Sequence, residues 1–231
     1  MEKVIQYYEN YDEDGRFFRD NAHMIEYLTT IHYFDRLFAP GSRILDACAG
    51  TGRYSFYLAN KGHYVTACDL VEHNINIIKS KPNANKLTDI YVCNALDLSR
   101  FEDNSFDVVL CMGAIYHLNS NDLKEKAISE CTRVCKSGGI VALTYVTGTL
   151  IEKLENIFFT STPCEIEEIA AKCDLERKHN VCTSGKTDNN KVNLNDSSDE
   201  DFQKYMEHYY LICEDDINFE TGGLGLWIGK K

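Results

Sequence analysis

The chain has 231 residues, 44% of them hydrophobic and 26% charged, which is enough for one sizeable core and too short to require two domains. Its formal net charge of −12 argues against nucleic acids and anionic membranes as partners, because phosphate binding needs clustered Lys and Arg. No apolar run approaches the ~20 residues of a membrane span, and the first residues lack a secretory pattern, so we expect a cytoplasmic protein.

The ten cysteines are expected to be reduced and to pack as small hydrophobic side chains, since most lie within apolar runs. Cys131 and Cys135 are one helical turn apart, but no second Cys or His pair at ligand spacing accompanies them. We therefore expect no metal site.

Residues 1–39 are expected to be helical and rich in aromatic side chains, and Pro40 and Gly41 end this segment. Its apolar residues recur at helical spacing and form one face: Met24, Tyr27, Leu28, Ile31, Phe34, Leu37 and Phe38.

From residue 42 onward, strand and helix patterns alternate. Strands are expected at 43–48, 63–70, 89–95, 106–112 and 140–146. Helices are expected at 54–61, 71–80 and 123–135. This alternation predicts a doubly wound α/β fold, in which a mostly parallel sheet is covered by helices on both faces.

The last third of the chain is less regular. Helices are expected at 163–172 and 201–213, and strands at 175–183 and 224–229. The acidic stretch 185–201 is expected to be a mobile loop.

The most informative local pattern is a buried strand that leads through Asp46 into a turn with Gly50 and Gly52, directly before a helix. Glycines at such a turn let a ligand approach the backbone. A second acid, Asp69, ends the next strand, and its spacing from Gly50 is typical of a glycine turn paired with a ribose-binding carboxylate. The alternative for Asp69 is that it only caps the following helix.

Two cofactor classes use such a frame. A nicotinamide site requires a third glycine, where this chain has Ser55, and Asp46 would repel the diphosphate. S-adenosylmethionine carries no phosphate, and its ammonium is attracted by an acid at position 46. The electrostatics therefore favour S-adenosylmethionine.

Five motifs in order over about residues 40–147 resemble those of class I S-adenosylmethionine-dependent methyltransferases. They are the turn at 45–52, Asp69, the pair at 94–95, the strand that starts at Phe106, and the segment 133–139. The resemblance implies a seven-stranded sheet whose last strand, 224–229, is antiparallel. It departs from the family at Cys48, where a glycine is usual, and at Asn94, which replaces an acid but still offers an acceptor oxygen.

The resemblance also implies roles for individual residues. Asp46 and the turn hold the methionine end, Asp69 binds the ribose, Leu70 packs on the adenine, and the segment from Asn94 reads its edge. The full set expected to bind the cofactor is Arg16, Asp46, Ala47, Ala49, Gly50, Thr51, Gly52, Asp69, Leu70, Asn94, Ala95, Leu96, Cys111 and Met112.

Tyr116 and His117 follow the fourth strand, at the edge where the family places its acceptor. His117 has the intrinsic pKa of a general base, and Tyr116 is a candidate to orient the acceptor; the alternative is that both pack a helix start. Residues 1–39 are expected to form a lid, in which Arg16 meets the cofactor carboxylate or is merely solvated.

The function we expect is methyl transfer from S-adenosylmethionine to a small-molecule acceptor. Residues 40–231 would form the methyltransferase domain, with acceptor-side elements in 148–223, in one structural domain overall. Two alternatives remain: a non-catalytic module that binds the cofactor, and a nicotinamide-dependent oxidoreductase. Oxygen, nitrogen and carbon acceptors stay open, and the sequence does not identify the oligomeric state.

Overall fold

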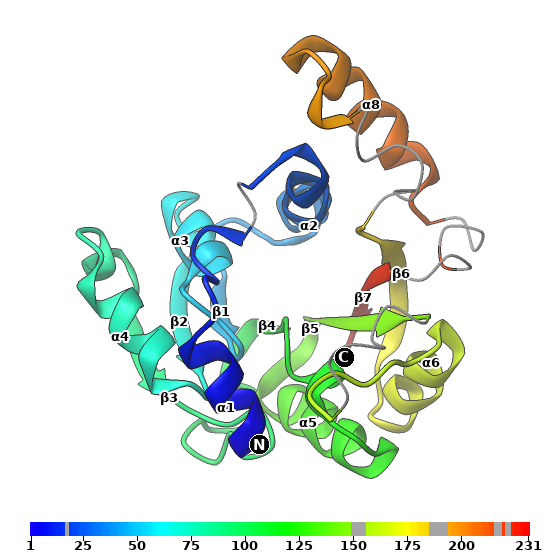
Figure 1. The fold of residues 1–231 in the computed structure, drawn as a ribbon. Coiled ribbons are helices and arrows are strands. Elements are labelled where there is room, and N and C mark those ends of the chain that lie inside the picture. Colours follow the sequence, from blue (N-terminus) through cyan, green and yellow to red (C-terminus); the bar gives the residue numbers. More distant parts are fainter. Residues whose placement is uncertain (17–18, 149–155, 185–193, 215–218, 220–222) are drawn as a thin grey trace.

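A single sheet of seven strands runs through the protein, and the computed structural model describes residues 1–16, 19–148, 156–184, 194–214, 219 and 223–231. The strands are β1 (Arg43–Asp46), β2 (Tyr64–Asp69), β3 (Asp89–Val92), β4 (Phe106–Cys111), β5 (Cys135–Thr147), β6 (Glu176–Cys182) and β7 (Gly223–Lys230). Their spatial order is β3-β2-β1-β4-β5-β7-β6 (Figure 1). Neighbours from β3 to β5 are parallel, whereas β7 is antiparallel to β5 and β6. The predicted fold class and the antiparallel last strand are confirmed.

Helices cover both faces of the sheet. They are α1 (Glu2–Glu9), α2 (Asn21–Leu37), α3 (Arg53–Asn60), α4 (Glu72–Ser80), α5 (Asn121–Val134), α6 (Pro163–Lys172) and α8 (Asp199–Ile212). The apolar residues of α2, α3, α4 and α8 join one core cluster, and those of α5 and α6 join another on the opposite face. Figure 1 shows the two layers with the sheet between them.

The central strands are apolar on both sides because both faces are covered. Side chains alternate along a strand, so Ile44 enters the cluster on one face and Leu45 enters the cluster on the other, each without exposed surface. Trp227 of β7 is fully buried, and its indole N–H donates to Glu167 at 2.9 Å. Because successive side chains of an apolar strand point to opposite faces of the sheet, one continuous apolar run contributes to the core on both faces.

Strand β5 is longer than expected and begins at Cys135 instead of residue 140. Residues 136–139, which follow the expected helix 123–135, belong to this strand and pair with the last residue of the chain. The N–H of Gly138 donates to the carbonyl of Lys231 at 2.7 Å, and the N–H of Lys231 donates to the carbonyl of Gly139 at 3.1 Å. A Cβ on Gly139 would stand 2.7 Å from the carbonyl oxygen of Asp107, so the close pairing needs a glycine there.

Two other expectations need correction. Residues 1–39 are not helical throughout, because residues 10–15, between α1 and α2, form no helix. Of the acidic segment 185–201, residues 185–193 lie outside the described residues, and the rest is not all loop. Helix α8 starts at Asp199, where Ser198 accepts a hydrogen bond from the N–H of Asp201 and caps the first turn.

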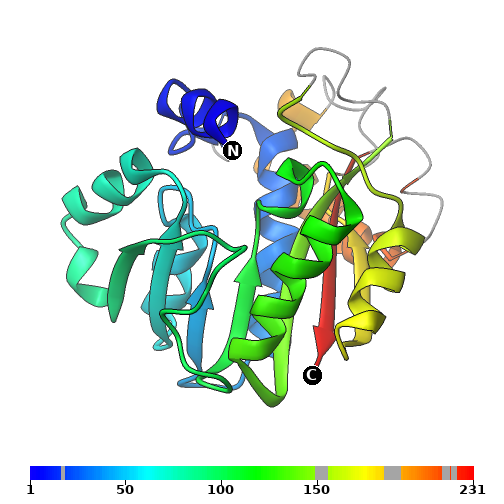
Figure 2. The ribbon, with the colours of Figure 1, turned by 90° about the horizontal axis from the view of Figure 1, so that it is seen from below.

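The carboxyl ends of β1, β2 and β4 meet at one edge of the sheet, and β7 starts there because it runs the opposite way. Helix α1 lies beyond this edge, as Figure 2 shows. The N-terminal segment is thereby placed over the glycine turn. None of the helices in the described part of the chain has the length and apolar character needed to cross a bilayer.

Candidate functional site

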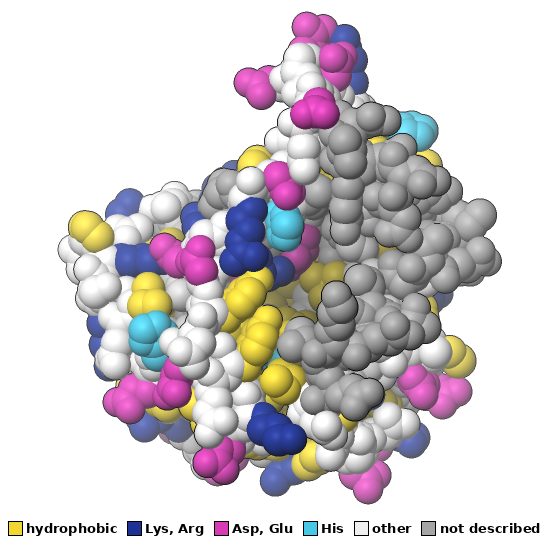
Figure 3. Space-filling view, in the orientation of Figure 1, with side chains coloured by type: hydrophobic (Ala, Val, Ile, Leu, Met, Phe, Trp, Pro, Cys, Tyr) yellow, Lys and Arg dark blue, Asp and Glu magenta, His cyan; other side chains and the backbone are white. Residues whose placement is uncertain are grey.

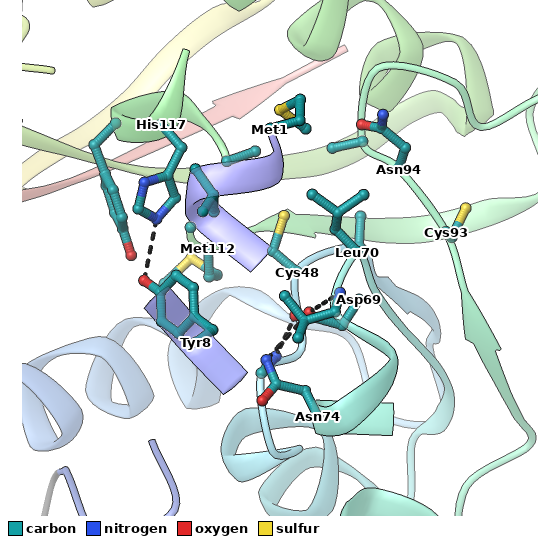
Figure 4. Close-up of a pocket in the computed structure, with 18 of the residues that line it drawn as sticks. Met1, Tyr8, Cys48, Asp69, Leu70, Asn74, Cys93, Asn94, Met112 and His117 are labelled. Atoms are coloured by element: carbon teal, nitrogen blue, oxygen red, sulfur yellow. Dashed lines mark hydrogen bonds between the residues drawn. The ribbon is translucent and has the colours of Figure 1, made fainter. Parts of the chain in front are cut away.

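A cavity lies at the carboxyl edge of the sheet, between α1 and the turns that follow β1, β2 and β4 (Figure 4). It contains about 730 Å³ of space not filled by protein atoms, part of it open to solvent, which is within the ~300–1,000 Å³ typical of small-molecule sites. The candidate residues that line it are Arg16, Ala47, Gly50, Asp69, Leu70, Asn94, Ala95, Leu96, Met112, Tyr116 and His117. The candidates outside the lining are Asp46, Ala49, Thr51, Gly52 and Cys111.

Asp69 ends β2 and ties the second strand to the glycine turn. Its Oδ2 accepts from the N–H of Gly50 at 2.8 Å, and its Oδ1 accepts from the N–H of Val71 at 2.8 Å and from Nδ2 of Asn74 at 3.2 Å. A carboxylate has about four acceptor sites, so one remains at Oδ2. Asp69 thus both caps the start of the α4 region and keeps an acceptor for one ligand hydroxyl.

The glycine turn has the backbone geometry of a ligand cradle. Gly50 and Gly52 have φ of +53° and +86°, a region that side chains strongly disfavour. A Cβ on Gly50 would stand 3.3 Å from Cγ of Glu13, which comes from the segment beyond α1. Gly52 faces inward, where a Cβ would stand 2.9 Å from Cε2 of Phe56. Of these two glycines, Gly50 lines the cavity and Gly52 does not.

Asp46 lies beneath the turn and is almost completely buried, at 1% exposure. Its Oδ2 accepts from the hydroxyl of Ser55 at 2.6 Å, while Oδ1 is buried and makes no full hydrogen bond, although the backbone N–H of Cys48 lies near enough to stabilise the carboxylate. Burial raises the pKa of this carboxyl to about 7, and the nearby charge of Asp69 adds to the increase. An unpaired buried acceptor next to the turn fits a cofactor that brings a cation or a bridging water to this end of the cavity.

At the opposite end of the cavity, Leu70 and the segment from Asn94 to Leu96 form an apolar slot with polar edges. The Oδ1 of Asn94 accepts from the N–H of Leu96 at 3.0 Å, which fixes the amide across the loop. The amide also retains donor groups and a second lone pair for a ligand. Apolar side chains beside a polar amide are the chemistry that binds a heterocyclic base.

His117 does not present a free basic nitrogen to the cavity. Its Nδ1–H donates to the carbonyl of Ile157 at 2.7 Å, and its Nε2 accepts from the hydroxyl of Tyr8 at 3.1 Å (Figure 4). Burial lowers the pKa of the imidazole to about 4. His117 is therefore neutral and weakly basic. Its Nε2 is covered by the hydroxyl of Tyr8, which also lines the cavity.

Arg16 lies in the cavity wall, and it is bound to two carboxylates of the protein. Its Nη1 and Nη2 donate to both oxygens of Glu26 at 2.7 and 3.0 Å, and its Nε donates to Oε1 of Glu13 at 3.2 Å. A guanidinium has five N–H donors, so a cofactor carboxylate would share Arg16 with these acids or displace one of them.

Tyr8, Glu13 and Asn74 are among the lining residues that were not identified as cofactor or acceptor contacts from the sequence. Tyr8 and Glu13 come from the segment before α2, which gives no spacing that relates it to the sheet. Asn74 had a readable signal, since it lies five residues after Asp69, in the early part of the helix that Asp69 precedes.

Cys131 and Cys135, the pair at one-turn spacing, are not part of the cavity lining. Cys131 and Cys135 are both fully buried, and each belongs to the core cluster under α5. In the described ranges, no three His, Cys, Asp or Glu side chains gather at metal-binding distance.

A family model described as a methyltransferase domain matches residues 45–143. One similar protein, the S-adenosyl-L-methionine-dependent Diels-Alderase of Talaromyces variabilis, is 36% identical over 110 residues, which are 46% of this chain and 37% of that protein. Another, "Probable tRNA methyltransferase 9B" of Mus musculus, is 31% identical over 100 residues, 43% of this chain and 21% of that protein. The chain thus spans well under half the length of these relatives.

Solved structures show the same fold over nearly the whole chain. A chain from Haloferax volcanii, solved in complex with the Trm112 methyltransferase activator, has a TM-score of 0.70 at 17% identity and covers 99% of this chain and 97% of its own length. The family match identifies a class I S-adenosylmethionine-dependent methyltransferase domain over residues 45–143, and the structural likeness shows the fold of the chain around it. S-adenosylmethionine is the methyl donor typical of that family.

Proposed function

We propose that this chain, with its class I methyltransferase domain, binds S-adenosylmethionine in the cavity at the carboxyl edge and methylates a small-molecule acceptor. The observation that carries the proposal is the buried bridge from Asp69 to the N–H of Gly50, which leaves one carboxylate acceptor facing the cavity. This arrangement provides an acid under a ribose beside a glycine turn for the amino-acid end.

When bound, S-adenosylmethionine supplies a methyl group on a positively charged sulfur. The protein's part is to bind and orient. Asp69 would accept from a ribose hydroxyl, and Leu70 and Asn94 would hold the adenine. Met112 and Tyr116 follow β4 and would lie near the sulfur. Placement of this kind supplies much of the acceleration of a group transfer.

We also propose that residues 1–39 act as a lid on this cavity. Tyr8, Glu13 and Arg16 all line it, and Arg16 reaches back to Glu26 on α2. Helix α1 thus forms the wall opposite the turns of the sheet. A lid that carries Arg16 would bring a cation to the cofactor carboxylate and keep water out.

A small acceptor is favoured over a nucleic acid by the shape and charge of the site. The cavity is covered by α1, and the formal net charge of the chain is −12. A phosphate-rich substrate would meet Glu13 and Glu26 beside the single Arg16. The relative whose name refers to tRNA matches this chain over 21% of its own length, so its name gives little support for a tRNA substrate.

Incubation of the protein with S-adenosylmethionine labelled on the methyl group and a cell metabolite extract tests the proposal. We expect the labelled methyl group to appear in a small organic product. Unlabelled S-adenosylhomocysteine should form in an equal amount. Binding of S-adenosylhomocysteine without any labelled product, over extracts from several growth conditions, would favour a second function.

That second function is a module that uses the bound cofactor without transferring its methyl group. The relative named as an S-adenosyl-L-methionine-dependent Diels-Alderase supports it, because that name describes a cycloaddition and not a methyl transfer. The low basicity of His117 is compatible with both functions.

A further inference from the structure

A second hollow adjoins the cofactor cavity on the side of β5 and β7. The two share Tyr8, Glu13, Arg16 and Tyr116, so these four residues surround the passage between them. The cofactor cavity extends from this passage toward β2 and β3, while the second hollow reaches Val146 at the end of β5. A methyl acceptor bound in the second hollow would reach the methyl donor through this passage. We call the second hollow the acceptor chamber.

Aromatic rings make up much of the wall of the acceptor chamber. The rings of Tyr7 and Tyr11 are stacked with centroids 5.3 Å apart, and those of Tyr116 and Phe158 are stacked at 5.7 Å. Tyr7 also meets Phe158 edge to face at 5.6 Å, which joins the two pairs. Together with Tyr8, these rings present π-faces and ring edges to whatever enters. In Figure 3 hydrophobic side chains, in yellow, gather over α1 on the same side of the molecule.

Among the described residues that line the acceptor chamber, the charged side chains leave a negative balance, while Arg19 lies outside this lining, against the ring of Tyr11. In the described part of its wall, the charged side chains are Glu13, Glu26 and Arg16. Each carboxylate side chain is only 16% exposed, and the one guanidinium is shared between them. Oε1 of Glu13 accepts from Nε of Arg16, no hydrogen bond to Oε2 is found within the described residues, and Glu13 belongs to the lining of both hollows. Partly buried negative charge favours a cation and repels an anion.

We propose that the acceptor chamber binds an amine in its cationic form, so that the methylated group is a nitrogen; this inference rests on the proposed function. Ammonium groups bind against Tyr faces through cation–π attraction, and the combination of rings with carboxylates is how proteins select them. One ring of the set already attracts a cation, since the guanidinium of Arg19 lies 5.2 Å from the Tyr11 centroid. Burial raises the pKa of Glu13, so its open oxygen can take the proton that an ammonium must lose before it reacts.

Calorimetry with three probes of one shape tests the inference. The protein is first saturated with S-adenosylhomocysteine and then titrated with phenethylammonium, 2-phenylethanol and phenylacetate. We expect the cation to bind at least tenfold more tightly than the alcohol and the anion to bind most weakly. Glu26→Gln should weaken the cation about tenfold and leave the alcohol unchanged, whereas the exposed Glu200→Gln should change neither.

Two further variants keep the inference testable if Glu26→Gln does not fold. Glu13→Gln keeps the paired contact between Arg16 and Glu26, and Tyr7→Leu removes one ring face; each should weaken the cation selectively. Equal binding of cation and alcohol, or tighter binding of the anion, would overturn the inference. If the unaltered protein does not bind S-adenosylhomocysteine in the saturation step, the proposed function itself is contradicted. That step is measured before any probe is added, so the two failures can be told apart.

Discussion

The Oδ2 of Asp69 accepts a hydrogen bond from the N–H of Gly50 at 2.8 Å, across 19 positions of sequence. This contact joins the tip of β2 to the turn after β1, so the acid and the glycine backbone form one rigid corner of the cavity. The second oxygen is held by Val71 and Asn74. A ligand that meets this corner finds an oriented acceptor next to an accessible backbone.

Replacing Asp69 with Asn should weaken the binding of S-adenosylhomocysteine by roughly 10- to 100-fold, the range for a lost hydrogen bond to a charged group. The amide would also turn a donor toward the N–H of Gly50 or of Val71, which is unfavourable. Calorimetry at pH 7.5 measures the change. Asp89→Asn, at the exposed start of β3, is the control and should bind like the unaltered protein. An Asp69→Asn variant that is folded and binds normally would remove ribose recognition from this residue.

Cofactor affinity should rise between pH 5.5 and 7, in part through Asp46. Burial raises the pKa of Asp46 to about 7, so the free protein holds a proton there below that pH. A cofactor ammonium stabilises the carboxylate, hence binding releases the proton and tightens as pH rises, by at most about tenfold per pH unit. Titration of S-adenosylhomocysteine at pH 5.5, 6.2 and 7 measures the slope.

Asp46→Asn should make that slope shallower, because the amide does not titrate. The remaining slope would come from Glu13, whose pKa burial also raises. The same variant should gain stability relative to the unaltered protein between pH 4 and 7. There the unfolded Asp46 is ionised while the folded one is protonated, so stability of the unaltered protein falls as pH rises. An unchanged slope in Asp46→Asn would show that this acid does not sense the cofactor.

Gly52→Ala should destabilise the protein more than Gly62→Ala. Both glycines have similar φ, +86° and +90°, so the conformational cost of the added Cβ is about 1 kcal/mol in each. Only at Gly52 does the Cβ meet a neighbour, Cε2 of Phe56 at 2.9 Å, whereas nothing lies within 4 Å at Gly62. Chemical denaturation should show an additional loss of about 1–3 kcal/mol at Gly52. Equal losses would mean that the turn relaxes without strain.

His117 should remain neutral as the pH falls from 8 to 5. Burial lowers its pKa to about 4, and its Nδ1–H is bound to the carbonyl of Ile157. Nitrogen-resolved NMR of the imidazoles, with His117→Asn to assign the signal, measures the titration and the tautomer. Tyr8→Phe should leave the tautomer unchanged and free Nε2. A midpoint near the ordinary value of 6.5 would restore His117 as a candidate general base.

The doubly wound core could be predicted because its signals are local. Each buried strand is a short apolar run bounded by turn residues, and the corner from Gly50 to Asp69 has a fixed spacing along the chain. The extension of β5 could not be predicted, because Gly138 bonds to Lys231 at the far end of the chain. Nothing local distinguishes a glycine that stops a helix from one that admits a neighbouring strand.

The contacts of the N-terminal segment in the cavity wall could not be predicted from local sequence patterns either. Tyr8 reaches His117 across 109 positions, and that contact changes His117 from a candidate base into a neutral acceptor. The sequence suggested Arg16 as a ligand for a carboxylate, but not that Glu13 and Glu26 already supply two. Pairing between distant charged groups depends on packing, which the pattern of a single segment does not contain.

A crystal structure of the protein with S-adenosylhomocysteine would test the central claim most directly, that the corner of Asp69 and Gly50 holds the cofactor. We predict a ribose hydroxyl within hydrogen-bond distance of Oδ2 of Asp69, the adenine between Leu70 and Asn94, and the sulfur directed toward Tyr8 and Tyr116. A ligand bound elsewhere, or in this cavity with its ribose away from Asp69, would contradict the account.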